Sequence, residues 1–115
     1  MDVMDELQRI FKALSERTRL EMLFLLLNEE ELCVCHFMAV LKLTQSKASR
    51  HLRYLYNCEL IKDRREGLWV YYRISDRLSC EAKSLIKSFK EITNGGAYKD
   101  ISTKLTKAKE RLKRI

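Results

Sequence analysis

The sequence predicts a mainly α-helical domain that carries one β-hairpin, which is an α+β fold class. Apolar residues recur every three or four positions over most of the chain, as on one face of an α-helix. Between residues 60 and 74 the period changes to two, which is typical of β-strands. The three glycines, Gly67, Gly95 and Gly96, lie where these patterns change or end. The predicted order is four helices, a hairpin, a fifth helix and a possible C-terminal helix.

Four helices are expected before the hairpin. They span about residues 7–14, 16–28, 35–41 and 45–57. Ser15 and Thr44 carry hydroxyl groups suited to cap the second and fourth helices. The second helix is expected to bury one apolar stripe, made of Leu20, Leu23, Phe24 and Leu27. The fourth helix turns Ala48, Leu52 and Leu55 inward, so its outer face is polar.

The hairpin is expected to pair residues 60–65 with residues 69–74. Its turn lies at Glu66-Gly67, where a glycine tolerates a positive φ angle. A fifth helix follows over Asp76–Ile92, with a wide apolar stripe formed by Leu78, Ala82, Leu85, Ile86 and Phe89. Because this stripe is wider than a small core requires, part of it is expected to contact a second subunit. Residues 99–114 form the possible last helix.

Charge is unevenly distributed along the 115 residues. Lysine and arginine number 23 against 16 acidic residues, which favours a polyanionic partner over a merely solvated basic surface. Residues 1–96 are expected to form the folded domain and residues 97–115 a basic tail, where much of the excess lies. No apolar run is long enough to span a membrane and the N-terminus lacks a secretory signal, so a cytoplasmic protein is expected.

Four cysteines are present, at positions 33, 35, 58 and 80. In a chain without an export signal they are expected to be reduced, because their spacing is not that of a disulfide scaffold. Cys33 and Cys35 stand one residue apart, just upstream of the polar helix. From spacing alone, a ligand-binding pair and two small buried residues are equally good interpretations.

Three segments in order carry a family resemblance: Glu31-Leu32-Cys33-Val34-Cys35, then residues 43–52 (LTQSKASRHL), then residues 64–73 (RREGLWVYYR). Together they resemble the ArsR family of winged helix-turn-helix, metal- and metalloid-responsive repressors. The resemblance implies a homodimer formed by the first and fifth helices. It also implies a helix-turn-helix over the third and fourth helices, with the hairpin as a wing.

Double-stranded operator DNA is the partner implied by this resemblance. Docking geometry places the N-terminal part of the fourth helix in a major groove. We then expect base edges to be contacted by Gln45, Ser46 and Ser49, and phosphates by Lys47, Arg50 and His51. Arg64 and Arg65 are expected to approach the neighbouring DNA backbone or the minor groove. A two-fold dimer requires an inverted repeat with half-sites spaced by one helical turn, roughly 10 base pairs.

Trivalent arsenic or antimony is the inducer implied by the resemblance, because the family's arsenic sensors carry Cys-Val-Cys at this point. A third thiol often follows three residues later in such sensors, where this chain has Met38. Cys58 or Cys80, from either subunit, remains a candidate for the third ligand, and so does a solvent or buffer ligand on a two-thiolate site. Side chains at i and i+2 of a helix point roughly 200° apart. Ligation of one ion by Cys33 and Cys35 is therefore expected to unwind the start of the third helix.

Two other functions remain open at this stage. The same fold could respond to thiol oxidation or persulfide formation, through Cys33 and Cys35 or through Cys58 and Cys80. Alternatively, the chain could be a nonspecific basic nucleic-acid-binding module with inert cysteines. An enzyme is not expected, since the sequence offers no set of nucleophile, base and orienting group and no phosphate-binding loop.

Overall fold

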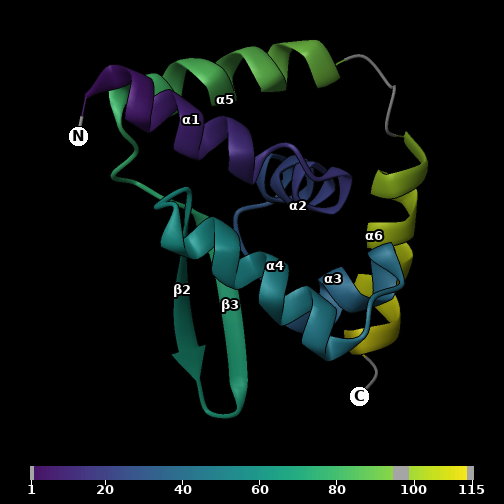
Figure 1. The fold of residues 1–115 in the computed structure, drawn as a ribbon. Helices are drawn as coiled ribbons and strands as arrows, with labels where there is room; N and C mark the ends of the chain where they lie inside the picture. The colour runs from purple at the N-terminus through teal and green to yellow at the C-terminus, as the bar shows by residue number, and fades with distance from the viewer. Residues whose placement is uncertain (1, 95–98, 114–115) are drawn as a thin grey trace.

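The computed structural model describes residues 2–94 and 99–113, which form six helices and a small antiparallel sheet (Figure 1). The helices are α1 (Val3–Ala13), α2 (Arg17–Asn28), α3 (Val34–Leu41), α4 (Gln45–Asn57), α5 (Cys80–Thr93) and α6 (Lys99–Lys113). The strands are β1 (Leu32–Cys33), β2 (Ile61–Glu66) and β3 (Trp69–Ile74). The predicted fold class and element order are confirmed, with one additional short strand.

Side-chain caps fix the helix boundaries. Thr44 caps α4 as predicted, because its Oγ1 accepts a hydrogen bond from the backbone N–H of Lys47 at 3.2 Å. Ser79 does the same for α5 through Ala82 N at 3.1 Å, so the predicted start at Asp76 is wrong. Ser15 does not cap α2, because the residue before that helix is Glu16 and makes no side-chain cap bond.

The sheet has the strand order β1-β3-β2. β2 and β3 form the predicted hairpin, and Gly67 in its turn has a φ of +62°, a conformation that disfavours a side chain. β1 adds a third strand through the pairs Leu32↔Tyr72 and Cys33↔Tyr71. The sequence did not predict β1, because two residues are too short to show a period of two.

Helix α2 lies at the centre of the molecule. The predicted stripe is only partly correct, since Leu23 and Phe24 are buried but Leu20 and Leu27 are only half-buried. The helix also buries Met22, Leu25 and Leu26, so it is apolar on most sides. The reason is that α2 packs against α4, α5 and β3 at the same time.

The remaining elements are arranged around this core. In Figure 1, α1 and α5 lie side by side at one edge, and the hairpin projects from the opposite edge. Helix α6 packs against α3 and buries Leu105 and Ala108 in the core. The C-terminal segment is therefore folded onto the helix-turn-helix. Among the described residues, no helix is long and apolar enough to cross a bilayer.

Candidate thiol site and recognition helix

Cys33 stands at a junction between two elements. It is the last residue of β1 and the N-cap of α3, with only 3% of its surface exposed. Its Sγ accepts a hydrogen bond from the backbone N–H of His36, and its own N–H donates to Nδ1 of His36 at 3.0 Å. Cys33 and His36 therefore cap the first turn of α3 reciprocally, as Ser and Glu do in a capping box.

The two sulfurs of Cys33 and Cys35 face each other. Cys33 has extended backbone angles (φ −78°, ψ 154°) and lies outside the helix. Its side chain accordingly lies close enough to the Cys35 thiol, in the first turn of α3, to help raise the pKa of that thiol. The predicted angle of roughly 200° between the two side chains applies only to two residues that are both helical, so it does not describe Cys33 and Cys35 in this structure.

Both thiols lie in a poorly solvated environment. Burial, together with the interaction with the neighbouring Cys33, raises the pKa of the Cys35 thiol to about 12. At neutral pH the Cys35 sulfur therefore carries its proton. A ligand that bonds to this sulfur must displace that proton, whereas reagents that attack only thiolates react slowly here.

Neither of the other cysteines lies near this pair. Cys58 is the C-cap of α4, at the opposite end of that helix from α3, and burial raises its pKa (Figure 1). Cys80 begins α5 and is exposed. In the described part of the chain, no group of three or more His, Cys, Asp or Glu side chains could hold a metal ion. One subunit thus brings together two of its four cysteine sulfurs.

The polar face of α4 is presented to solvent. Gln45, Ser46, Lys47, Ser49 and Arg50 are all exposed, while Ala48, Leu52 and Leu55 are buried beneath them. Among these five polar side chains, the described structure shows no side-chain hydrogen bond or ion pair. The N-terminal half of α4 therefore offers donors and acceptors to an external partner, as the predicted recognition helix requires.

His51 differs from the other α4 residues predicted to contact DNA, because it is buried. It is 8% exposed, and its Nδ1 accepts a hydrogen bond from Arg19 Nη1 at 3.2 Å. Burial lowers its pKa, and the nearby charges of Arg19 and Arg50 lower it further. The prediction that His51 contacts phosphate is thus corrected, since a buried neutral imidazole that already accepts a bond from a cation is a structural residue.

Arg19 was missed by the sequence reasoning. It is buried, and besides His51 it donates to the carbonyl oxygens of Ala13 at 2.6 Å and Lys12 at 3.3 Å. Its guanidinium also lies 4.1 Å from the ring centroid of Tyr54. Arg19 therefore joins the end of α1 to α4. The only signal in the sequence was an arginine beside the apolar positions of the second helix.

The two wing arginines differ in environment. Arg64 binds both carboxylate oxygens of Glu31, with Nη2–Oε1 at 2.6 Å and Nε–Oε2 at 2.7 Å, and also reaches Glu66 at 2.8 Å. These bonds lower the pKa of Glu31 and raise the pKa of Arg64. Arg65 alternates to the other face and is exposed. The expected phosphate contact is thus open to Arg65, while Arg64 is paired internally.

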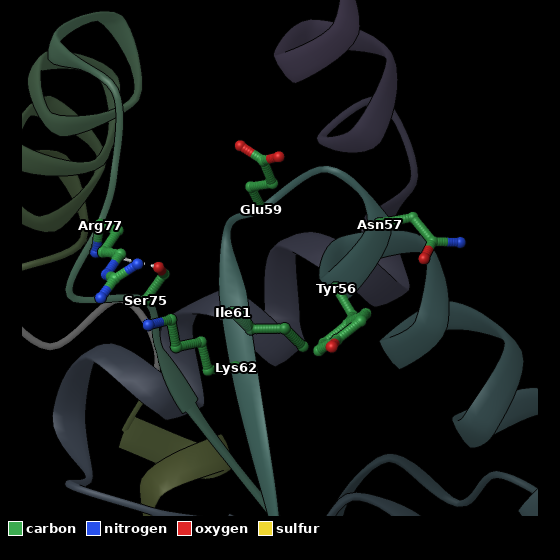
Figure 2. A pocket seen from close by; sticks show the side chains of 7 residues that line it. All are labelled: Tyr56, Asn57, Glu59, Ile61, Lys62, Ser75 and Arg77. Carbon is green, nitrogen blue, oxygen red and sulfur yellow. Dashed lines mark hydrogen bonds between the residues drawn. The ribbon is translucent and has the colours of Figure 1, made fainter.

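Two hollows on the surface accompany these groups. One, of about 570 Å³, is lined by Glu29, Glu30, Glu31, Arg64, Arg73 and Lys109 and lies beside the Arg64 pair. The other, of about 480 Å³, lies where α4 meets the sheet, between Tyr56 and Asn57 on one side and Lys62 and Arg77 on the other (Figure 2). Of the charged residues that line this second hollow, Lys62 is paired with Asp76 at 2.7 Å.

Comparison with known proteins agrees with this geometry. Residues 10–63 match the family described as bacterial regulatory protein, arsR family. The arsenic resistance transcriptional regulator ArsR1 of Pseudomonas putida is 41% identical over 78 residues, which are 68% of this chain and 61% of that protein. The arsenical resistance operon repressor of Escherichia coli is also 41% identical over 78 residues, covering 68% of this chain and 67% of that repressor.

A solved structure shares the fold. The homodimeric winged helix-turn-helix DNA-binding domain of a possible ArsR-family regulator from Mycobacterium bovis superimposes with a TM-score of 0.66 and 28% identity, covering 80% of this chain and 82% of that one. The chain spans about three fifths of the length of the Pseudomonas putida regulator. Helix α6 lies outside the residues matched by the family.

Proposed function

This chain belongs to the ArsR family of bacterial regulatory proteins, whose members are DNA-binding transcriptional regulators and not enzymes, and we propose that it is a homodimeric repressor released from its operator by trivalent arsenic or antimony. The observation that carries this proposal is the facing pair of thiols, Cys33 and Cys35, at the start of the helix-turn-helix. Relatives named for arsenic resistance support it.

Metalloid ligation fits the chemistry of the pair. Trivalent arsenic and antimony are soft centres that prefer thiolates to oxygen or nitrogen ligands. Bond formation at Cys33 and Cys35 displaces the thiol protons, so the raised pKa of Cys35 does not prevent it. A third ligand would come from a small thiol, from water or from the other subunit.

Release follows from the capping role of Cys33. When its sulfur binds the metalloid, the N–H of His36 loses its acceptor and the first turn of α3 is weakened; a lost cap typically costs about 1 kcal/mol. Since α3 packs directly on α4, the recognition helix shifts relative to the groove. The coupling is reciprocal, and a typical value of about 1 to 3 kcal/mol changes operator affinity roughly 5- to 150-fold.

DNA binding is assigned to α4 and the hairpin. Gln45, Ser46 and Ser49 contact base edges, while Lys47 and Arg50 contact phosphates. Arg65 on the exposed face of the hairpin approaches the neighbouring backbone. The operator is an inverted repeat whose half-sites are about one helical turn apart.

The dimer is assigned to α1 and α5. These adjacent helices expose large apolar side chains, among them Met4, Phe11 and Ile92. Half-buried Leu85 and Phe89 continue this apolar face on α5, as the wide stripe in the sequence predicts. The homodimeric domain from Mycobacterium bovis supports such an assembly.

The test is operator binding by the full chain with and without arsenite. Wild-type protein should lose affinity roughly 5- to 150-fold on addition of arsenite, whereas Cys33→Ser and Cys35→Ser should bind DNA normally and ignore arsenite. Serine keeps the capping ability at position 33, so these variants should fold. Cys80→Ser, which changes an exposed thiol elsewhere, is the control and should respond as wild type does.

Two outcomes would contradict the assignment. If both variants at the pair still release DNA with arsenite, the thiol site lies elsewhere. If peroxide or polysulfide releases the protein and arsenite does not, the signal is oxidative. The raised pKa of Cys35 disfavours that alternative, because oxidants react with the thiolate.

A further inference from the structure

A row of three side chains crosses the sheet from the thiol site to the hairpin. Cys33 on β1 is paired with Tyr71 on β3, and Tyr71 is paired with Arg64 on β2. Directly opposed residues of antiparallel strands point to the same face of a sheet. The sensing cysteine, the aromatic ring and the wing arginine are therefore neighbours on one face.

Glu31 completes this arrangement. It stands two residues before Cys33, next to the start of β1, and binds Arg64 through both carboxylate oxygens. The third nitrogen of the Arg64 guanidinium binds Glu66 at 2.8 Å, and the group lies 4.6 Å from the ring centroid of Tyr71. All three nitrogens of Arg64 are thus engaged by carboxylates of the same chain.

These are the nitrogens that a phosphate group would need. A guanidinium binds carboxylate and phosphate in the same bidentate geometry, so the two anions exclude each other on one edge. Half of the Arg64 side chain remains exposed, so phosphate can approach it. Arg64 can therefore bind a DNA phosphate only to the extent that Glu31 and Glu66 release its guanidinium group.

We propose that Glu31 competes with DNA phosphate for Arg64 and that this competition links the thiol pair to the wing. The link to the thiols rests on the function proposed above. Since β1 is only two residues long, a displacement of Cys33 on ligation displaces Glu31 and alters its hold on Arg64. The metalloid signal then reaches DNA by a second route, through the sheet as well as through α3.

The competition is tested by neutralising Glu31. Glu31→Gln should bind a short duplex of arbitrary sequence more tightly than Glu30→Gln, by up to roughly fivefold at low salt, as expected for the loss of an exposed ion pair. Glu30 is a matched control, since its removal changes the net charge equally and it makes no ion pair in the described structure. Fluorescence anisotropy measures both affinities.

A double variant identifies the cation concerned. Adding Arg64→Gln to Glu31→Gln should abolish the gain in affinity. Adding Arg65→Gln, on the opposite face of the same strand, should instead leave the gain caused by Glu31→Gln unchanged. Equal affinities of Glu31→Gln and Glu30→Gln overturn the proposal. So does a gain that survives removal of Arg64.

A measurement with arsenite on the operator tests the link to the thiols. Arsenite should change the operator affinity of Glu31→Gln by a different factor from that of Glu30→Gln, because the route through Glu31 is missing in the first variant. An equal effect on both variants overturns the link. If arsenite weakens no variant while Glu31→Gln still binds duplex more tightly, the proposed function has failed and the competition for Arg64 stands.

Discussion

Single residues carry the connections between helices in this protein. Arg19 is buried and joins two carbonyl oxygens at the end of α1 to His51 in the middle of α4. The imidazole must be neutral at Nδ1 to accept this bond. His36 plays a related part at α3, where it accepts the Cys33 N–H, and burial lowers its pKa as it does for His51. Both histidines are thus held in the neutral form by the fold.

Acid should therefore destabilise the protein over a defined range of pH. The folded-state pKa of each histidine lies below the ordinary 6.5. As pH falls below about 6.5, the unfolded chain therefore binds more protons than the folded chain, which lowers the free energy of unfolding. Around neutral pH stability should be constant, and below pH 6.5 it should decline, down to the folded-state pKa values. Urea denaturation monitored by circular dichroism at a series of pH values measures this.

The variant His51→Gln is the control for the pH effect. Its amide oxygen can still accept a bond from Arg19 but does not titrate, so the decline between pH 6.5 and about 4.5 should become shallower. The lowered pKa values of Glu31 and Asp76 change stability only below their ordinary values of 4.5 and 3.8. The pH range in which the carboxylates act is therefore separate from that of the histidines. An unchanged slope in His51→Gln would contradict the assignment.

At the scale of elements, α6 supports the helix that carries the thiols. It packs on α3 through Leu105 and Ala108, which are 3% and 1% exposed, and Lys109 binds Glu29 at 2.6 Å. Lys99, Lys104 and Lys107 of the same helix are exposed. Residues 99–113 of the predicted basic tail therefore form an amphipathic helix with its apolar side on the core.

Shortening the apolar side of α6 should lower the stability of the whole domain. Leu105→Ala should reduce the free energy of unfolding by about 2 to 5 kcal/mol, because it removes a fully packed side chain. Lys107→Ala, on the solvent side of the same helix, should change it by less than about 0.5 kcal/mol. Chemical denaturation measures both, and similar small values for the two variants would mean that α6 does not pack on α3 in solution.

At the scale of the molecule, the thiol and DNA-binding groups lie away from the apolar face. Figure 1 places α1 and α5 at the edge opposite to the hairpin. The exposed apolar residues Met4, Phe11 and Ile92 belong to these two helices. A dimer formed there leaves both recognition helices and both hairpins uncovered, which is the arrangement that an inverted repeat requires.

A charge introduced on this face should separate the subunits. Phe11→Glu replaces a side chain that is 56% exposed in the single chain, so the fold should survive while the dimer dissociates, because a carboxylate would be desolvated in the interface. Sedimentation should show a monomer with much weaker operator binding. Leu68→Glu, at the fully exposed tip of the hairpin, should remain dimeric. A dimeric Phe11→Glu protein would place the interface elsewhere.

The sequence by itself determined the class of fold, the boundaries set by local caps such as Thr44, the glycine turn at Gly67 and the exposed polar face of α4. These features follow from contacts between residues close in sequence, which periodicity and turn chemistry report.

The tertiary structure alone decided that Cys33 belongs to a strand and lies beside Cys35, that Arg19 holds His51, and that Glu31 holds Arg64. The two arginine contacts join residues more than thirty positions apart, and the conformation of Cys33 depends on strand pairing with Tyr71. Spacing along the chain cannot predict them, because a period reveals which face of an element is buried but not which distant group will meet it.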